Sequence, residues 1–245
     1  DLETMVHLLK FDSVHGSHLR KVCPSSEPDM VRVNGHSVRK YAYKEPAEIP
    51  WSLHQTDLVI ESSGVFLTPG ALRAHLQPGV GWVVLTCPPN EPLDNMIVMG
   101  VNEKSLRRED RLISNASCTT NCAAPLLKVF EERWGIDKVL MNTVHPYTNS
   151  QSLIDAPQAD LRRARSAAWN IIPTTTSAIR AIKQIMPSLD GRFDGFATRV
   201  PVANGSFVEL NMLLKKETNS DEINEHILSV SASSMQGIIE YCHDP

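Results

Sequence analysis

The chain has 245 residues, of which 42% are hydrophobic and 21% are charged, and its formal net charge is −4 at pH 7. This length and composition are typical of a globular protein with one large core or two modest ones. The slight acidic excess gives no general reason to expect nucleic acid or an anionic membrane as a partner, and the longest apolar runs have the length of strands, not of membrane-spanning helices.

Cysteine usage indicates a reducing compartment. The five cysteines are an odd and sparse set, which argues against a disulfide framework, and the first residues show no signal-peptide pattern. We therefore expect a cytoplasmic protein. The chain opens at Asp1 without a methionine and ends at Pro245, just after a strand-like stretch at 238–241, so we expect it to be an internal piece of a longer protein.

The first half of the chain alternates predicted strands with predicted helices. Apolar residues in 2–9 recur with helical spacing and predict a helix that packs on another element. Continuous apolar runs at 57–61, 82–86 and 96–101 predict strands that are buried on both faces, and 68–76 supplies a helix between the first two. Strand, helix and strand at this spacing indicate an α/β half with a parallel sheet.

The second half of the chain mixes longer, alternating predicted strands with helices, and this pattern predicts an α+β domain that begins near Ser117. Its predicted elements are helices over 123–134 and 178–186, strands over 139–145, 196–199 and 206–214, a long loop over 147–170, and a last helix capped by Asn219 with Glu222. Alternation within 139–145 places Met141, Thr143 and His145 on one face. Pro125 lacks an amide donor, so we expect a kink or a short break in the first of these helices.

The segment 114–122, with the sequence SNASCTTNC, has the residue types of a reactive site. Cys118 lies at an expected helix start, where free amides and partial positive charge favour a thiolate. The same amides, with the hydroxyls of Ser117 and Thr119, suit a phosphate anion. The residue types alone are also compatible with Cys118 as a small buried residue that only fills space. The same alternative applies to Cys122, which lies one helical turn further along and would pack in the core.

The run SNASCTTNCAAP at 114–125 resembles the active-site signature of the glyceraldehyde-3-phosphate dehydrogenases. Further segments resemble this family in the same order and extend over nearly the whole chain: LLKFDSVHG at 8–16, ESSGVF at 61–66, VMGVN at 98–102, TVHPYTNSQ at 143–151, DAPQADLRRAR at 155–165, IIPTTT at 171–176 and RVPVAN at 199–204. The resemblance implies an α/β protein. Residues 1–117 would form an incomplete Rossmann-type doubly wound parallel sheet without its first βαβ unit, and 118–245 an α+β catalytic domain with a mixed sheet and a missing C-terminal part.

The resemblance also implies an oxidoreductase of glycolysis that converts glyceraldehyde 3-phosphate to 1,3-bisphosphoglycerate. Cys118 would attack the aldehyde to form a thiohemiacetal, and His145 would take the proton as hydride leaves for NAD. Inorganic phosphate would then cleave the resulting thioester. Without the resemblance of the segment around it, the prediction for His145 would be an ordinary surface or core histidine at the end of a strand.

Two anion sites follow from the same resemblance. Thr148 and Arg199 match the positions that hold the substrate phosphate. The positions for inorganic phosphate are matched by Ser117, Thr119 and Thr176, with Ser177 and Arg163 nearby. Ser177 stands where the family usually has glycine, which puts phosphate affinity in question because serine adds bulk and restricts the backbone. Arg163 is also open to interpretation as part of a solvated basic run.

The cofactor site is represented only by its later parts. Ser63 and Thr86 match family positions near the cofactor, and Pro157 goes with NAD more than with NADP. The glycine-rich turn and the acidic residue for the adenine ribose belong upstream of Asp1, so we expect no turnover from this chain alone. The family also implies a homotetramer in which the loop 147–170 reaches a neighbouring subunit's cofactor site, and no metal.

Two alternatives remain open at this point. Erythrose-4-phosphate dehydrogenase shares the active-site signature, although Thr148 and the run 174–176 favour the triose enzyme. A catalytically inactive interaction protein of the same fold is the other. An idle site has no physical need for four retained residues, and their joint presence opposes this alternative: Cys118, His145, Thr148 and Arg199.

Overall fold

The computed structural model describes residues 1–16 and 21–244. The chain divides into two compact units, Asp1–Pro50 and Trp51–Pro245. The predicted domain boundary near Ser117 stays a prediction. Within the described ranges, no helix is both long enough and apolar enough to cross a membrane.

The first unit contains one helix and a small antiparallel sheet. Helix α1 (Leu2–Lys10) begins after Asp1, whose carboxylate accepts a hydrogen bond from the Thr4 amide at 2.7 Å. This confirms the predicted helix. Strands β1 (Val22–Pro24), β2 (Met30–Val33) and β3 (His36–Arg39) pair in the order β1-β2-β3, and a short 3₁₀ turn follows at Pro46–Glu48.

The small sheet was not foreseen, although its tight turn has a sequence signal. Asn34 and Gly35 join β2 to β3 with φ values of +50° and +89°. Positive φ at both positions is what a two-residue hairpin of type I′ requires, and Asn-Gly is its preferred pair.

The second unit begins with a four-stranded parallel sheet. Its strands are β4 (Leu58–Glu61), β5 (Trp82–Leu85), β7 (Leu112–Ser114) and β6 (Asn95–Met96), in the order β4-β5-β7-β6. The 3₁₀ helix Trp51–His54 precedes them, and the short helix α2 (Pro69–Arg73) lies between β4 and β5 in the chain. The two predicted strands around 57–61 and 82–86 and the helix between them are confirmed.

The predicted strand at 96–101 is wrong beyond Met96. The chain turns there, because the Val101 amide donates to Val98 O at 3.0 Å and Gly100 has φ +80°. The Asn102 side chain binds the Val98 amide and Met96 O at 2.9 and 2.8 Å, so a side chain takes the place of a strand partner.

A second, mixed sheet follows in the same unit. It contains β8 (Ile136–Pro146), β9 (Ile172–Thr174), β10 (Phe193–Val200) and β11 (Phe207–Leu214), in the order β11-β8-β10-β9. Strand β10 runs parallel to β8, whereas β11 is antiparallel to β8 and β9 to β10. The predicted fold class, a parallel sheet followed by a mixed one, is confirmed. Residues 147–170 contain no helix or strand, as predicted.

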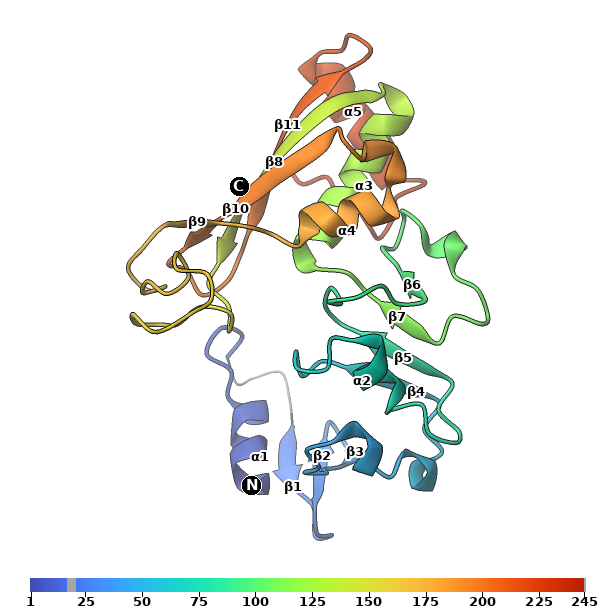
Figure 1. The fold of residues 1–245 in the computed structure, drawn as a ribbon, viewed down its shortest axis with the longest axis vertical. Helices are drawn as coiled ribbons and strands as arrows, with labels where there is room; N and C mark the ends of the chain where they lie inside the picture. The colour runs from blue at the N-terminus through green and yellow to red at the C-terminus, as the bar shows by residue number, and fades with distance from the viewer. Residues whose placement is uncertain (17–20, 245) are drawn as a thin grey trace. The chain divides into compact units, whose positions relative to one another are not determined.

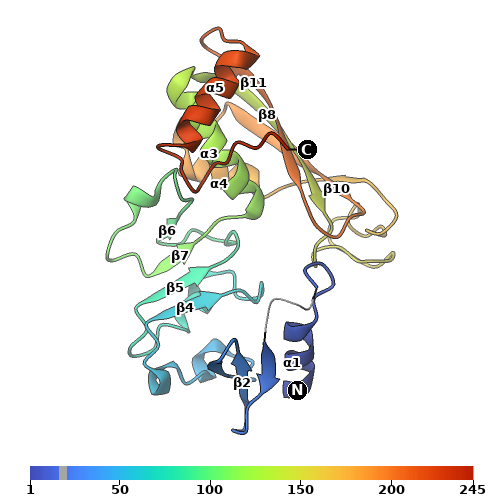
Figure 2. The same ribbon diagram turned by 180° about the vertical axis from the view of Figure 1, so that it is seen from behind.

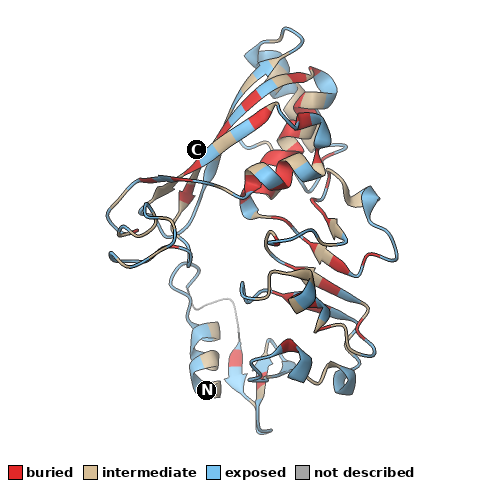
Figure 3. Ribbon diagram, viewed as in Figure 1, coloured by how far each residue is buried: buried red, intermediate tan, exposed pale blue. Residues whose placement is uncertain are grey.

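Three helices cover one face of the mixed sheet (Figures 1 and 2). They are α3 (Cys118–Arg133), α4 (Ala178–Ile185) and α5 (Ser220–Ser231). Their core includes Leu127 and Ile182 against Met141 and Phe193 of the sheet. Burial along the strands alternates accordingly, and the other face of the sheet stays open (Figure 3).

Several helix predictions can be checked in detail. Helix α3 begins five residues before the predicted start and continues through Pro125, so the expected break is absent; Pro125 itself is buried on the packed face. Asn219 accepts a hydrogen bond from the Glu222 amide at 3.0 Å and caps α5, as predicted. The prediction of a strand-like stretch at 238–241 is wrong, since these residues form a turn and irregular chain. The remaining short helices are the 3₁₀ segments Glu103–Ser105 and Pro187–Leu189.

Candidate active site

The start of helix α3 is built to expose Cys118. Ser117 is the N-cap residue, and its hydroxyl oxygen accepts a hydrogen bond from the Thr120 amide at 3.1 Å. Cys118 is therefore the first helical residue, close to amides that have no partner within the helix. The prediction of a cysteine at a helix start is confirmed, and the side chain is exposed.

A strained turn precedes the cysteine. Ala116 is fully buried and has φ +56°, a conformation that costs a non-glycine residue on the order of 1–2 kcal/mol. Its amide donates to Ser114 Oγ at 3.0 Å, and the Ser114 hydroxyl donates to Cys87 O at 2.9 Å. Strain of this kind persists only where the surroundings enforce it, and such positions gather at functional sites.

His145 meets Cys118 from the neighbouring strand. Along β8, Met141, Thr143 and His145 are all buried on one face, as predicted. This alternation directs the imidazole toward the helix start, where His145 Nε2 lies 3.2 Å from Cys118 Sγ. The two residues are 27 positions apart in the chain, so strand and helix together form the pair.

The surroundings of His145 favour its neutral form. Burial lowers the pKa of the imidazole, the positive charge of Arg199 lowers it further, and the hydrogen bond to Pro146 O opposes both. Nδ1 lies 2.8 Å from Pro146 O. Arg199 Nη1, which can only donate, also lies 2.8 Å from this Nδ1, so the two contacts favour opposite tautomers. The tautomer with the proton on Nδ1 is the one that leaves Nε2 free to accept the thiol proton of Cys118. A neutral ring in this position can act as a base.

Arg199 lies beside His145 because β10 pairs with β8 in parallel, with these two residues in register. Its Nη1 is 2.8 Å from His145 Nδ1, 2.7 Å from Pro146 O and 3.5 Å from Thr148 Oγ1. Burial and the charge of Arg163 lower the pKa of the guanidinium. Its Nε is buried and has no partner in the described part of the chain. An anion at this point would supply the missing acceptor.

Arg163 is held in place rather than solvated. Its guanidinium donates to Thr174 Oγ1 at 3.1 Å, Ser150 Oγ at 3.3 Å and Thr175 O at 3.0 Å. It also lies 3.6 Å from the Asp160 carboxylate. These contacts fix the orientation of the guanidinium, so they argue against the alternative in which Arg163 is only part of a solvated basic run.

The start of helix α4 contributes a second set of small polar groups. Thr176 Oγ1 accepts a hydrogen bond from the Ala178 amide at 3.2 Å. Ser177 has φ −66°, which any L-residue adopts, so serine in place of glycine introduces no backbone strain here. The concern about restricted backbone at this position therefore does not hold in this structure.

These groups surround one pocket of about 750 Å³. Every predicted site residue lines it except Ser63, whose hydroxyl instead donates to the Glu61 carboxylate. The predicted lining residues are Thr86, Ser117, Cys118, Thr119, His145, Thr148, Arg163, Thr176, Ser177 and Arg199. Thr119 is buried, with Oγ1 3.5 Å from Thr143 Oγ1.

Sequence reasoning missed other residues of the pocket, notably Cys87 and Arg180. Arg180 is in the first turn of α4 and donates to Pro89 O at 3.0 Å, and no carboxylate among the described residues pairs with it. No local pattern pointed to Arg180, because its partner Pro89 lies 91 positions away in the chain. No group of three or more potential metal ligands occurs in the ranges that the structure describes.

Comparisons with known proteins give a consistent result. The family model described as "Glyceraldehyde 3-phosphate dehydrogenase, C-terminal domain" matches residues 117–245, and the one described as "Glyceraldehyde 3-phosphate dehydrogenase, NAD binding domain" matches residues 1–69. The plasmid glyceraldehyde-3-phosphate dehydrogenase of Cupriavidus necator is 44% identical over 238 residues, which are 97% of this chain and 70% of that protein. Glyceraldehyde-3-phosphate dehydrogenase 2 of Bacillus subtilis is 42% identical over 244 residues, 99% of this chain and 71% of the relative. The chloroplastic glyceraldehyde-3-phosphate dehydrogenase A of Scenedesmus vacuolatus is 42% identical over 240 residues, 98% and 76% of the two chains.

Proposed function

Because the chain belongs to the glyceraldehyde-3-phosphate dehydrogenase family, we propose that its site performs the oxidative phosphorylation of glyceraldehyde 3-phosphate, with Cys118 as nucleophile and His145 as base. The observation that supports these roles most is the 3.2 Å contact between Cys118 Sγ and His145 Nε2 at a helix start. The neutral imidazole takes the thiol proton, the sulfur attacks the aldehyde carbon, and the imidazolium then returns the proton to the former carbonyl oxygen. The product of this step is a tetrahedral thiohemiacetal on Cys118.

The oxidation step needs a base and a hydride acceptor. His145 takes the hydroxyl proton of the thiohemiacetal as the C–H bond breaks, which leaves a thioester on Cys118. The nicotinamide ring of the cofactor, when bound, accepts the hydride. An oxygen of inorganic phosphate then attacks the thioester carbon, the C–S bond breaks, and the acyl phosphate leaves with the thiolate restored.

Two groups of residues divide the phosphate binding in this proposal. Arg199 and Thr148 hold the substrate phosphate, because Arg199 Nε is the buried donor that lacks an acceptor. Ser117, Thr119 and Thr176 hold the attacking phosphate near the starts of α3 and α4, with the Ser177 amide and Arg163 beside them. Because each anion has its own set of donors, both phosphates can bind in the same pocket at the same time.

The cofactor class is a nicotinamide dinucleotide, since the family model that matches residues 1–69 describes a NAD-binding domain. The described residues fit this class. Thr86 follows the carboxyl end of parallel strand β5 and lines the same pocket as Cys118, which is where such sheets bind ligands. Within the class we propose NAD rather than NADP, on the basis of Pro157. Competition between the two for binding would decide.

An alkylation experiment tests the proposed roles without any cofactor. The rate of iodoacetamide labelling would be measured at each of the five cysteines by peptide mass spectrometry. Glyceraldehyde 3-phosphate should protect Cys118 by forming the thiohemiacetal, and glyceraldehyde without phosphate should protect it far less. His145→Asn should remove the labelling advantage of Cys118. Equal labelling with and without the aldehyde phosphate would refute the proposal.

The same experiment addresses the alternatives. Erythrose 4-phosphate should protect Cys118 less than the triose phosphate does, in agreement with the names of the relatives. An inactive protein of this fold would show no selective reactivity at Cys118. Neither alternative is favoured by the contacts of Cys118, His145 and Arg199.

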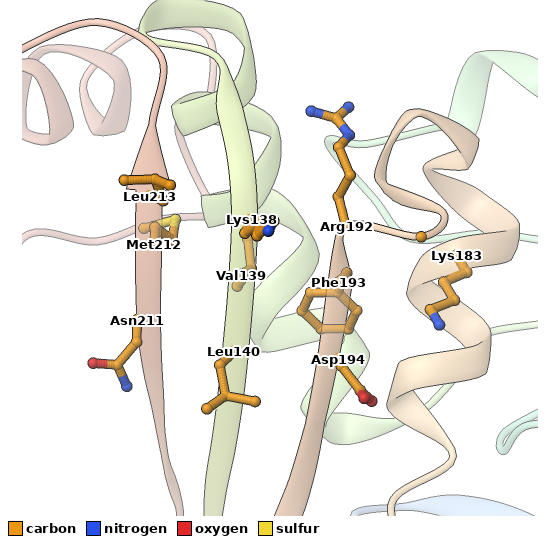
Figure 4. A pocket seen from close by; sticks show the side chains of 11 residues that line it. Lys138, Val139, Leu140, Lys183, Arg192, Phe193, Asp194, Asn211, Met212 and Leu213 are labelled. Atoms are coloured by element: carbon orange, nitrogen blue, oxygen red, sulfur yellow. The ribbon is translucent and has the colours of Figure 1, made fainter.

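We also propose that the chain assembles as a homotetramer, with the open face of the mixed sheet as one contact between copies. Helices α3, α4 and α5 leave this face uncovered, and Leu140, Phe207 and Leu213 on it are 50%, 61% and 58% exposed. Lys138 on β8 and Asp194 on β10 carry opposite charges beside a pocket of about 660 Å³, which Arg192 and, from α4, Lys183 also line (Figure 4). A two-fold axis would pair such charges between copies.

Sedimentation would test this assembly. The wild type should sediment as an oligomer at micromolar concentration, and Leu140→Asp should shift it to a smaller species. A monomeric wild type would refute the proposal. The further idea that the loop 147–170 reaches a neighbour's cofactor site rests on the same oligomer.

The cytoplasm is the location that we propose. All five cysteines are free, which is usual for proteins of a reducing compartment. Fractionation of the source cells with compartment markers would test it.

A further inference from the structure

A buried carboxylate and a buried imidazole, Glu61 and His75, have no part in the chemistry above. Glu61 is 5% exposed and His75 is 3% exposed. Glu61 Oε2 lies 3.1 Å from His75 Nε2. Burying a carboxylate costs free energy unless its oxygens are hydrogen-bonded, so the donors that surround Glu61 show what it organises.

The carboxylate of Glu61 binds one of the two predicted cofactor residues, Ser63, and the main chain of Glu61 binds the other, Thr86. Oε1 accepts from the Ser63 amide at 2.7 Å and from the Ser63 hydroxyl. The main-chain oxygen of Glu61 accepts from the Thr86 amide at 3.0 Å and from Thr86 Oγ1 at 3.2 Å. A single residue therefore joins Ser63, after β4, to Thr86, after β5.

The position of Glu61 in the sheet gives this arrangement its significance. Glu61 is the last residue of β4 and pairs in register with Leu85, the last residue of the parallel strand β5. Ligands of open parallel sheets bind beyond these carboxyl ends. Thr86 also lines the pocket of Cys118. Burial, and then the charge of Glu61, raise the pKa of Cys87, which follows Thr86, so the carboxylate acts close to the pocket.

His75 can hold Glu61 in only one way. The carboxylate accepts hydrogen bonds, so His75 Nε2 must carry the proton that lies between them. Nδ1 is buried and has no partner in the described ranges, which suits an unprotonated nitrogen better than an unpaired N–H. The rings of Trp51 and Phe66 lie 5.9 and 6.3 Å from the imidazole and fix its place.

We propose that Glu61, oriented by His75, is a positioning residue for the nicotinamide dinucleotide: it fixes the turn at Ser63 and the hydroxyl of Thr86 at the edge of the sheet where the cofactor binds. This inference rests on the proposed function, because it assigns residues to that cofactor. Glu61 need not touch the cofactor. Its carboxylate acts through the turn at Ser63, because Thr86 is bound by the main-chain oxygen of Glu61. Cofactor affinity should therefore fall when the carboxylate is lost, and phosphate affinity should not.

The test measures binding of NAD⁺ and of inorganic phosphate to the intact protein by NMR titration, with thermal melts of the same samples. Glu61→Gln and His75→Leu should weaken NAD⁺ binding on the order of tenfold, and leave phosphate binding within about twofold. His75→Gln keeps an amide donor for Glu61 Oε2 and should restore most of the affinity. A purely structural role would lower the melting temperature without this selective loss.

Glu131→Gln is the matched control. Glu131 is also a partly buried carboxylate, bound by the Ile136 amide at 2.6 Å and by Arg192 at 3.1 Å, but it lies on α3 and away from the strand ends of the parallel sheet. Its replacement should lower the melting temperature and leave NAD⁺ binding within about twofold. A comparable NAD⁺ loss in this control would overturn the inference, because any buried carboxylate would then give the same result.

The remaining outcomes separate the inference from the proposed function. If Glu61→Gln binds NAD⁺ as tightly as the wild type does, the inference is wrong and the proposed function stands. If the wild type binds phosphate but not NAD⁺, the cofactor assignment and the inference both fail. If Glu61→Gln loses phosphate binding as well, a second variant, Glu61→Asp, tests the inference. Aspartate keeps the negative charge, but its shorter side chain does not reach Ser63 as glutamate does. Unchanged NAD⁺ affinity in Glu61→Asp overturns the inference.

Discussion

Replacing Ser117 by alanine should separate the stability of helix α3 from the binding of phosphate. The Ser117 hydroxyl oxygen accepts from the Thr120 amide at 3.1 Å and lies 2.7 Å from Thr120 Oγ1. Removing an N-cap hydroxyl costs about 1 kcal/mol. In a unit of the size of Trp51–Pro245 this lowers the melting temperature by about 2–4 °C. Calorimetric melts of the wild type and the variant measure it.

The same hydroxyl is proposed to bind the attacking phosphate. Its oxygen can continue to accept from the Thr120 amide while its proton turns to the anion. A hydrogen bond to a charged group is worth about 1.5–3 kcal/mol, so its loss should weaken phosphate binding roughly tenfold to a hundredfold.

Glycine at the same position distinguishes the two roles of Ser117. It caps a helix within a few tenths of a kcal/mol of serine but lacks the hydroxyl. Ser117→Gly should therefore melt close to the wild type and bind inorganic phosphate as weakly as Ser117→Ala, measured by titration calorimetry. Full phosphate affinity in Ser117→Gly would refute the phosphate role, and an unchanged melt of Ser117→Ala would refute the capping argument.

Four further measurements follow from the structure. NMR titration should place the pKa of His145 below its ordinary value, and Arg199→Gln should raise it, because the charge of Arg199 is one of the causes of the shift. The folded pKa of His145 is lower than the unfolded one, so between these two values the unfolded chain binds more protons than the folded chain. The contribution of His145 to the free energy of unfolding is therefore fully present above about pH 6.5 and is lost as the pH decreases. His145→Gln should flatten that part of the curve of stability against pH. Cys87, whose pKa is raised by burial and by the charge of Glu61, should be alkylated more slowly at pH 7 than exposed Cys23, and equal rates in peptide mass spectrometry would contradict this. Leu127→Ala removes a fully buried side chain from the core of the mixed sheet and should destabilise the fold by about 3 kcal/mol, lowering the melting temperature by about 10 °C in a calorimetric scan.

Local rules of chain geometry predicted much of the fold. The period of two along β8 placed Thr143 and His145 on one face, which the structure shows to be the buried one, and the small residues before Cys118 indicated a helix start. The same rules failed at 96–101, where an apolar run was taken for a strand. There the Asn102 side chain binds the backbone and turns the chain, and hydrophobicity gives no information about such a bond.

The rest of the site depends on contacts between distant segments. Arg199 reaches His145 because β10 pairs with β8 in register, and no local pattern specifies that pairing. The resemblance to a family gave Arg199 its place before the pairing was known. Arg180 and His75 lie outside every segment that resembles the family, and their partners, Pro89 and Glu61, are 91 and 14 positions away in the chain.

The site concentrates features that oppose folding. Ala116 has a left-handed backbone that costs it on the order of 1–2 kcal/mol. Arg199 is partly buried with an unpaired Nε and a lowered pKa, and Arg163 and Arg180 line the same pocket. Of these three guanidinium groups only Arg163 lies within 4 Å of a carboxylate in the described chain. A fold retained only as an interaction scaffold would gain stability by losing such groups, whereas a site that must hold two phosphates beside a thiol has a use for each of them. The balance of these costs therefore favours an enzyme over an inactive relative.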